Sequence, residues 1–266
     1  MNNPGLFQAR WNLRRLALCN FLPLALLAFW LWPTGQMLCV IFDEWLFHRL
    51  NAPLASHPIW LHSWAIASLR PFDTVVGVIL LALTIKGDWV FERVEVRQAF
   101  LGFLSILLVL VFIRLLFSTL VGYMDWQHNS PSMMIKGAVR MSDYFPDLEN
   151  RWEFKDRSTQ SFPADHASVL LIWALFMTVF SRNSWQTLLI WSLTLLFMMP
   201  RLVAGANWGQ DDYIGGLLLA VWVLGWGYYT PFAYHASAFF LKVTAPAFGL
   251  LEKLPVVSRM SVVRGA

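Results

Sequence analysis

The sequence predicts an all-α integral membrane protein with six transmembrane helices and an interfacial amphipathic helix between the first and the second. Of its 266 residues, 58% are apolar and 14% are charged, whereas a soluble domain has roughly 45–50% and about 25%. Fifteen Trp and 21 Phe residues add the aromatic side chains that gather at membrane interfaces. A soluble domain of this length cannot hide so much apolar surface, because its surface-to-volume ratio forces polar residues outward. Lipid is therefore the predicted solvent for most of the chain.

Six apolar segments approach the ~20 residues that cross a hydrocarbon core of about 30 Å. The second is the weakest, because Arg70, Pro71 and Asp73 crowd its start. Gly215 and Gly216 are expected to let the sixth segment pack closely against its neighbours. Together the segments form one membrane domain over residues 1–266. The expected spans are 16–33, 70–86, 99–121, 164–181, 184–201 and 211–230.

Two further segments are expected to lie on the membrane surface. Segment 37–64 places apolar residues at helical spacing among charged ones, which is typical of an interfacial helix. Its apolar residues are Phe42, Trp45, Leu46 and Leu50. Segment 234–252 has a similar pattern and belongs to an interfacial tail at 231–266.

The cations of the chain predict its orientation. The net charge is +4, but the cations form no dense run, so no nucleic-acid partner is expected. Arg10, Arg14 and Arg15 precede the first span and favour a cytoplasmic N-terminus, and six spans return the C-terminus to the same side. The polar loop 122–163 then lies outside the cytoplasm. The junctions 164–166 and 201–212 are expected to converge on that face with it.

The first of these junctions carries the sequence Ser-Phe-Pro-Ala-Asp-His at 161–166. Proline and a capping Asp165 stand just before an apolar run, so a helix is expected to begin here. The free N–H groups and the dipole of a helix start favour an anion, and His166 lies on the first turn. The alternative is that Asp165 is only a cap and His166 an interface histidine.

The second junction combines Arg201, Gly205 and the pair Asp211 and Asp212. An arginine at membrane depth is costly unless it pairs or binds an anion. Its planar fork suits phosphate, and Gly205 would allow close approach of the backbone to a ligand. The alternative is an Arg201–Asp211 ion pair that joins two helices.

Together these two blocks resemble the type 2 phosphatidic acid phosphatase superfamily of membrane lipid phosphatases and phosphotransferases. Its members read Pro-Ser-Gly-His and then Ser-Arg-x5-His-x3-Asp, where this chain has PADH at 163–166 and then Arg201, Asn207 and Asp211. Within the superfamily, the lipid A 1-diphosphate synthases are the most similar. They carry Ser-Phe-Pro-Gly-Asp-His and Gly-Ala-His-Trp where this chain has SFPADH and GANW, and they share a Lys-Asp pair that corresponds to Lys155 and Asp156. The resemblance runs from about residue 37 to residue 231.

The resemblance implies transfer or hydrolysis of a lipid phosphate. In the family, the third-block histidine attacks phosphorus, the second-block histidine protonates the leaving oxygen, and cations hold the phosphoryl oxygens. Carried over, His166 is the proton donor and Asp211 the orienting carboxylate. The implied phosphate-binding residues are Arg201, Lys155, Ser161 and Asp165.

Two positions depart from the family pattern. Asn207 occupies the place of the nucleophile, and an amide cannot form a phosphohistidine. The first block reads Gln-His-Asn-Ser-Pro at 127–131, so His128 falls near the position of an expected arginine. Three interpretations follow: direct transfer between two bound lipids with His166 or His128 as base, His128 as a new nucleophile, or a site that binds an anionic lipid and does no chemistry.

The resemblance also implies the setting of the site. The expected partners are membrane lipids, with lipid A or a polyprenyl pyrophosphate as substrate. A membrane protein is a further candidate partner. The expected location is the inner membrane of a bacterium with the site facing the periplasm, and no cofactor and no metal is expected. Arg114, inside the third span, either replaces the missing first-block cation or pairs with an acid at a helix end.

Overall fold

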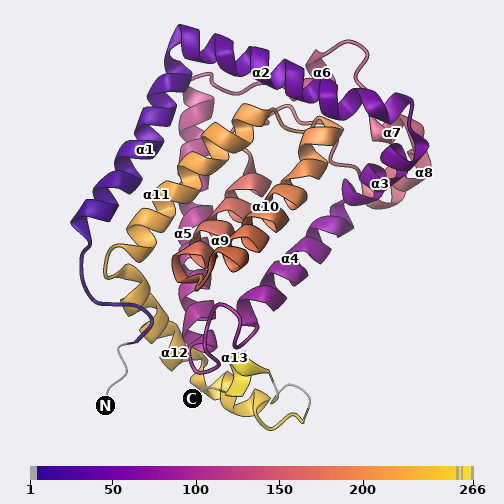
Figure 1. Ribbon diagram of the computed structural model, residues 1–266. Coiled ribbons are helices and arrows are strands. Elements are labelled where there is room, and N and C mark those ends of the chain that lie inside the picture. The colour runs from indigo at the N-terminus through magenta and orange to yellow at the C-terminus, as the bar shows by residue number, and fades with distance from the viewer. Residues whose placement is uncertain (1–4, 256–257, 259, 265–266) are drawn as a thin grey trace.

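A computed structural model of the protein describes residues 5–255, 258 and 260–264 (Figure 1). This part of the chain is helical and contains no β-strand. Its elements are α1 (Leu13–Leu31), α2 (Pro33–Asn51), the 3₁₀ turn η1 (Ala52–Ala55), α3 (Pro58–Ala67), α4 (Arg70–Ile85), α5 (Val96–Tyr123), α6 (Pro131–Met134), α7 (Met141–Tyr144), α8 (Pro146–Trp152), α9 (Asp165–Phe180), α10 (Ser184–Ala204), the π-helical segment η2 (Asp211–Gly216), α11 (Leu217–Tyr228), α12 (Phe232–Leu251) and α13 (Ser261–Arg264).

Each of the six apolar segments expected to span the membrane forms a helix, with bounds close to the predicted ones. They are α1, α4, α5, α9, α10 and the continuous pair η2–α11. By length and composition, α1, α5 and α10 can cross a membrane, and η2–α11 with α12 forms a pair bent by 74° that makes a fourth candidate. Helices α4 and α9 have 16 residues each, which is about 24 Å of helix. The all-helical membrane class is confirmed at this level, and six crossings stay a prediction.

The segment expected to form one interfacial helix is divided by prolines. Helix α1 ends at the extended residue Trp32, and Pro33 begins α2, where its missing N–H costs no hydrogen bond. Pro53 and Pro58 then open η1 and α3, because a proline inside a helix removes a hydrogen bond and clashes with the preceding turn. Segment 37–64 is therefore α2, η1 and α3, and α2 runs across one end of the bundle (Figure 1).

Helix α2 turns two of its polar residues toward the protein. Asp43 and Asn51 are buried, while Phe42 and Trp45 are exposed. The Asn51 amide donates to the carbonyl oxygens of Val139 at 3.0 Å and Val203 at 2.9 Å. The exposed Phe42 and Trp45 suit contact with lipid, and the buried Asn51 ties α2 to the loop and the helix beneath it.

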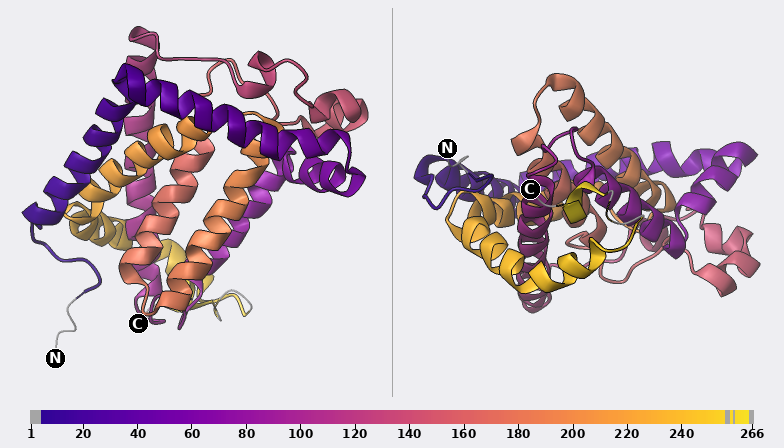
Figure 2. Two further views of the ribbon diagram at one scale, coloured as in Figure 1. Left: turned by 45° about the horizontal axis from the view of Figure 1, so that its top comes forward. Right: turned by 90° about the horizontal axis from the view of Figure 1, so that it is seen from below.

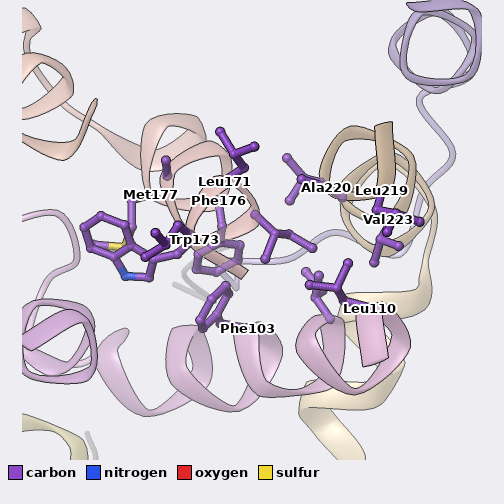
Figure 3. Packing of buried hydrophobic residues seen from close by; sticks show 14 of the residues in the cluster. Phe103, Leu110, Leu171, Trp173, Phe176, Met177, Leu219, Ala220 and Val223 are labelled. Atoms are coloured by element: carbon purple, nitrogen blue, oxygen red, sulfur yellow. The ribbon is translucent and has the colours of Figure 1, made fainter. Parts of the chain in front are cut away.

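The core lies where α5, α9 and α11 pack together (Figure 3). Phe103 of α5 faces Phe176 of α9, with ring centroids 4.9 Å apart, and Leu110 lies farther along α5 on the side of α11. The core side chains that Figure 3 labels are Phe103, Leu110, Leu171, Trp173, Phe176, Met177, Leu219, Ala220 and Val223. A cluster of this kind fixes the directions of α9 and α11, which both begin at the same end of the molecule.

The polar loop between α5 and α9 lies at the end of the bundle that α2 covers (Figures 1 and 2). The opposite end gathers both terminal parts of the chain. The Leu6 amide donates to the Gln98 side chain at 3.3 Å, and Arg97 donates to the carbonyl of Val262 at 2.9 Å. Helix α12, which corresponds to the predicted interfacial segment 234–252, crosses this end when the molecule is seen from below (Figure 2). Of the predicted tail 231–266, residues 256–257, 259 and 265–266 lie outside the described residues.

Candidate functional site

The start of α9 places His166 at the end of the bundle that α2 covers. Asp165 is the first residue of the helix, and the cap position is Ala164, so Asp165 does not cap the helix as expected. Its Oδ1 instead accepts the His166 amide at 2.9 Å. The His166 ring lies on the first turn, with Nε2 3.0 Å from the carbonyl oxygen of Phe197. The hydrogen bond to Phe197 holds the ring against α10.

Arg201 forms an ion pair with Asp73 and not with Asp211. The guanidinium donates to Asp73 Oδ2, and the other Asp73 oxygen is 3.8 Å from His166 Nδ1. Arg201 is buried, and a buried guanidinium needs a carboxylate or another anion beside it. Asp73 therefore joins α4, α9 and α10 at the site.

Arg70 and Lys155 lie beside Arg201 because a short backbone pairing brings two segments together. Leu69 and Phe154 form an isolated antiparallel bridge, and the Lys155 amide donates to Ser68 at 2.9 Å. Partial burial lowers the pKa of Lys155, and the charges of Arg70 and Arg201 lower it further. Three cations therefore gather at this place, and we call Arg70, Lys155 and Arg201 the cation cluster.

Arg114 reaches the same region from α5. Its Nη2 is 3.6 Å from Asp165 Oδ2, which is the ion pair with a helix-end acid that the sequence allowed. Its Nε is buried without a hydrogen-bond partner among the described residues. Arg114 is thus held at the first turn of α9, close to His166.

His128 is hydrogen-bonded to Asp211. His128 Nε2 is 2.8 Å from Asp211 Oδ1, and Asp211 Oδ2 accepts the Trp208 amide at 2.7 Å. Burial lowers the pKa of His128, but the hydrogen bond and charge of Asp211, with a backbone hydrogen bond at Trp126, outweigh it and raise this pKa above its ordinary value. The family resemblance assigns Asp211 the role of orienting the nucleophile. In this structure Asp211 instead contacts a histidine from the loop.

Asn207 faces the second aspartate of the pair. Its Nδ2 donates to Asp212 Oδ1 at 3.2 Å, while Asp212 Oδ2 is buried with no partner in the described part of the chain. Asn207 lines a space of about 10 Å³ with Asp43, Pro131 and Trp208. That is roughly the space that one water needs. This space is too small for a phosphate group.

Gly205 ends α10 in the left-handed conformation, with φ of 75°. A Cβ there would lie 2.6 Å from the Phe47 ring and 3.0 Å from Ser132 Cβ. The sequence suggested that a ligand approaches the backbone at Gly205. In the structure Phe47 of α2 and Ser132 of the loop occupy that position instead. Glycine is required at this turn for packing as well as for its backbone angles.

Segment 161–166 connects the His128–Asp211 pair to the cation cluster. The Ser161 hydroxyl and amide both donate to the His128 carbonyl, at 3.1 and 3.2 Å. The Ala164 amide donates to the carbonyl of Asp211 at 3.1 Å. Ser161 thus fixes the loop that carries His128, and it makes no contact with the cations in this structure.

Asp43 of α2 is buried against the segment that carries Asp211. It accepts the Gln210 amide at 3.0 Å and the Tyr213 hydroxyl at 3.2 Å. Burial raises the pKa of Asp43 to about 7, although the hydrogen bond from Gln210 lowers it in part. Within residues 5–255, 258 and 260–264, no group of three or more His, Cys, Asp or Glu side chains is placed to hold a metal ion.

The sequence named most of these residues, but it missed Asp73, Arg70 and Asp43 as part of the site, and also Glu153, which forms an ion pair with Arg70. The first two carried a signal, because charged residues at the start of an apolar segment are costly and need partners. Glu153 and Asp43 lie in segments whose position relative to the site depends on the tertiary structure.

Comparisons with known proteins find similarity over the part of the chain that carries these residues. Residues 131–236 match the PAP2 superfamily. The chain is 28% identical over 236 residues to the lipid A 1-diphosphate synthase of Escherichia coli (strain K12), across 87% of this chain and 94% of that protein. No solved structure gives a significant match. Residues 131–236 are therefore similar to a PAP2 superfamily domain, and they include Lys155, His166, Arg201 and Asp211.

Proposed function

We propose that this protein transfers or hydrolyses a phosphate group on a membrane lipid, with lipid A or a polyprenyl pyrophosphate as substrate. The PAP2 superfamily domain and the similarity to a lipid A-modifying enzyme support the class of reaction. The cation cluster supports an anionic substrate, because arginine and lysine side chains bind phosphoryl oxygens.

The observation that carries this proposal is the hydrogen bond of 2.8 Å between His128 and Asp211. An imidazole oriented by a carboxylate is the usual arrangement of a catalytic base or nucleophile. Asn207 cannot supply that imidazole, and His128 supplies it from the loop. The family arrangement of a histidine beside this aspartate is thereby retained with a different residue.

The reaction uses the nitrogen of His128 that does not face Asp211. Because Nε2 faces Asp211, Nδ1 is the nitrogen that reacts, and it must carry no proton when it does. As nucleophile, Nδ1 forms a bond to phosphorus while the bond to the leaving oxygen breaks, and His166 gives that oxygen a proton. As base, Nδ1 takes the proton of the acceptor hydroxyl while the acceptor oxygen attacks phosphorus.

The proposal includes the orientation of the protein in the inner membrane of a bacterium. With six crossings, α2 and α3 lie on the membrane surface, both termini are cytoplasmic and the site faces the periplasm. In support, the loops α4–α5 and α9–α10, which carry Lys86, Arg93 and Arg182, lie at the same end of the bundle as α13, opposite the start of α9 (Figure 1). Cations near the ends of short loops favour the cytoplasmic side.

The experiment that tests this function measures phosphate release and transfer by the purified protein in detergent. Labelled undecaprenyl pyrophosphate serves as donor, with and without lipid A as acceptor. We expect His128→Gln to lower turnover by at least 100-fold, in line with the loss of a positioned base or nucleophile. His48→Gln, which changes an exposed histidine of α2, is the matched control and keeps wild-type turnover.

A label that becomes attached to the wild-type protein but not to His128→Gln identifies His128 as the nucleophile. Turnover that depends on His128 without a labelled intermediate identifies it as the base. Equal turnover in His128→Gln and the wild type contradicts the proposal.

A second candidate function is binding of an anionic lipid without chemistry, as a regulatory or partner subunit. The hydrogen bond between Asn207 and Asp212 favours it, because the side chain at the nucleophile position is used within the protein. Saturable lipid binding with neither release nor transfer in the same assay would establish this function in place of the first.

A further inference from the structure

The cation cluster extends beyond the residues that the PAP2 domain supplies. Lys155 and Arg201 lie within residues 131–236, and Arg70 lies outside them at the first residue of α4. The Arg70 amide donates to the Glu153 carbonyl at 3.1 Å, beside the bridge between Leu69 and Phe154. Backbone pairing therefore fixes Arg70 next to Lys155 independently of the side chains.

Two carboxylates pair with these three cations, which leaves one positive charge in excess. Arg70 donates to Glu153 Oε1, and Lys155 Nζ is 4.0 Å from the same oxygen. Arg201 donates to Asp73. Glu153 is therefore shared by two cations, and one side-chain movement would free both.

The pair of Arg70 and Glu153 remains open to water. Both side chains are 51% exposed, so an anion can reach them without rearrangement of the core. Exposed ion pairs contribute little to stability, because water and salt screen them and ordering the side chains costs entropy. A structural tie between α4 and the loop is already supplied by the backbone bridge.

The backbone of Glu153 is held in an unfavourable conformation. Its φ is 53° and its ψ is 121°, angles that favour glycine. Such conformations cost free energy and persist where the surrounding structure imposes them, often at ligand sites. Here the conformation directs the carboxylate toward Arg70 while the carbonyl accepts the Arg70 amide.

We propose that Arg70 is a phosphate ligand of this site and that Glu153 occupies the place of the phosphate until the lipid binds. The phosphoryl oxygens then displace the Glu153 carboxylate from Arg70 and Lys155, and Arg201 contacts the same group. The inference deepens the proposed function and rests on it only for the identity of the ligand as a lipid phosphate.

The test compares variants with opposite expected effects on binding. Dihexanoyl phosphatidic acid and inorganic phosphate are titrated calorimetrically into the purified full-length protein in detergent. Arg70→Gln removes a ligand, so we expect about tenfold weaker binding, the usual size for a lost hydrogen bond to a charged group. Glu153→Gln removes a competitor, so we expect binding several-fold tighter than that of the wild type.

The matched control is Arg93→Gln. Arg93 forms a comparable exposed pair with Asp88, 2.5 Å long, at the opposite end of the molecule, so its loss should leave binding unchanged. Thermal unfolding of each variant checks that it is folded. If Arg70→Gln does not fold, Arg70→Lys keeps the charge without the planar fork, and we expect binding between those of the wild type and the glutamine variant.

Weaker binding in both Arg70→Gln and Glu153→Gln would mean a structural ion pair and would overturn the proposal, as would unchanged binding in Arg70→Gln. Equal shifts with both probes identify the phosphate group as the ligand, and shifts with phosphatidic acid alone identify the lipid head group. If the wild type turns over its substrate but Arg70→Gln binds phosphate as the wild type does, the proposed function stands and this inference fails. If the variants show the expected binding shifts but the wild type has no turnover, this inference stands and the proposed function fails.

Discussion

At the residue scale, the site differs from the pattern of the superfamily that it resembles in which side chains the two aspartates contact. Asp211 holds His128, and Asn207 turns to Asp212. Neither contact can be derived from the spacing of Arg201, Asn207 and Asp211 alone, because the spacing says nothing about the loop that carries His128. This arrangement leaves one imidazole beside Asp211, and this makes His128 the residue to test first.

The pH dependence of stability provides a prediction for the same pair. The folded state raises the pKa of His128, so its contribution is fully present below the unfolded value of about 6.5 and is lost as pH rises through the folded pKa. We expect the difference in unfolding temperature between the wild type and His128→Gln to shrink as pH rises from 5.5 to about 9. Differential scanning fluorimetry in detergent measures it.

Asp43→Asn is the control for that experiment. Burial raises the pKa of Asp43 to about 7, so its ionisation also reduces stability as pH rises from its ordinary value of 3.8 to about 7, and no further above that. The shrinking difference should remain in the Asp43→Asn background. A difference that is constant across pH would show that the pair does not favour the charged imidazole.

At the element scale, η2 must lie close to segment 161–166 for Asp211 and His166 to share one end of the bundle. Gly215 makes this possible, as the sequence predicted, because a Cβ there would lie 2.7 Å from Pro163 Cβ and 2.9 Å from the Phe162 ring. Contacts this short cannot be relieved by one flexible side chain, since the Pro163 Cα is also at 2.9 Å. The π-helical segment can therefore shift only by moving the start of α9.

Gly215→Ala should destabilise the protein by about 1–3 kcal/mol through overpacking and should lower turnover with it. Gly77→Ala is the matched control, because nothing lies within 4 Å of an added Cβ at this position of α4. Alanine in place of an exposed helical glycine is neutral or slightly stabilising. Chemical denaturation in detergent compares the two, and equal stability would mean that η2 is not closely packed.

At the scale of the whole molecule, the two ends of the bundle differ in character. One end carries α2, the loop 124–164 and the site, and the other carries the terminal segments and α13 (Figure 1). The six-crossing arrangement assigns the first end to the periplasm. Lys136 and Arg182 are exposed at opposite ends and can report on this assignment.

In a background with Cys19 and Cys39 replaced by serine, we expect a membrane-impermeant maleimide to label Lys136→Cys in cells with a permeable outer membrane. Arg182→Cys should be labelled only after the inner membrane is disrupted, because a charged reagent does not cross the hydrocarbon core. Equal labelling of both variants before disruption would contradict the orientation.

The sequence by itself determined the class of the protein, the bounds of its apolar helices and two of the three blocks of the site. Composition and the length of the apolar segments can be read from the chain, and the thickness of the hydrocarbon core sets the length that a crossing helix needs. The blocks at 161–166 and 201–211 also follow from local order, since each stands at a helix end.

Only the tertiary structure decided which charges meet. Asp73 with Arg201, Glu153 with Arg70 and His128 with Asp211 are pairs separated by 128, 83 and 83 positions in the chain. Their partners are set by helix packing and by one short backbone bridge, and a sequence pattern does not encode either. The physical reason is that hydrophobic burial is non-directional and leaves the polar pairing to the geometry of the packed helices.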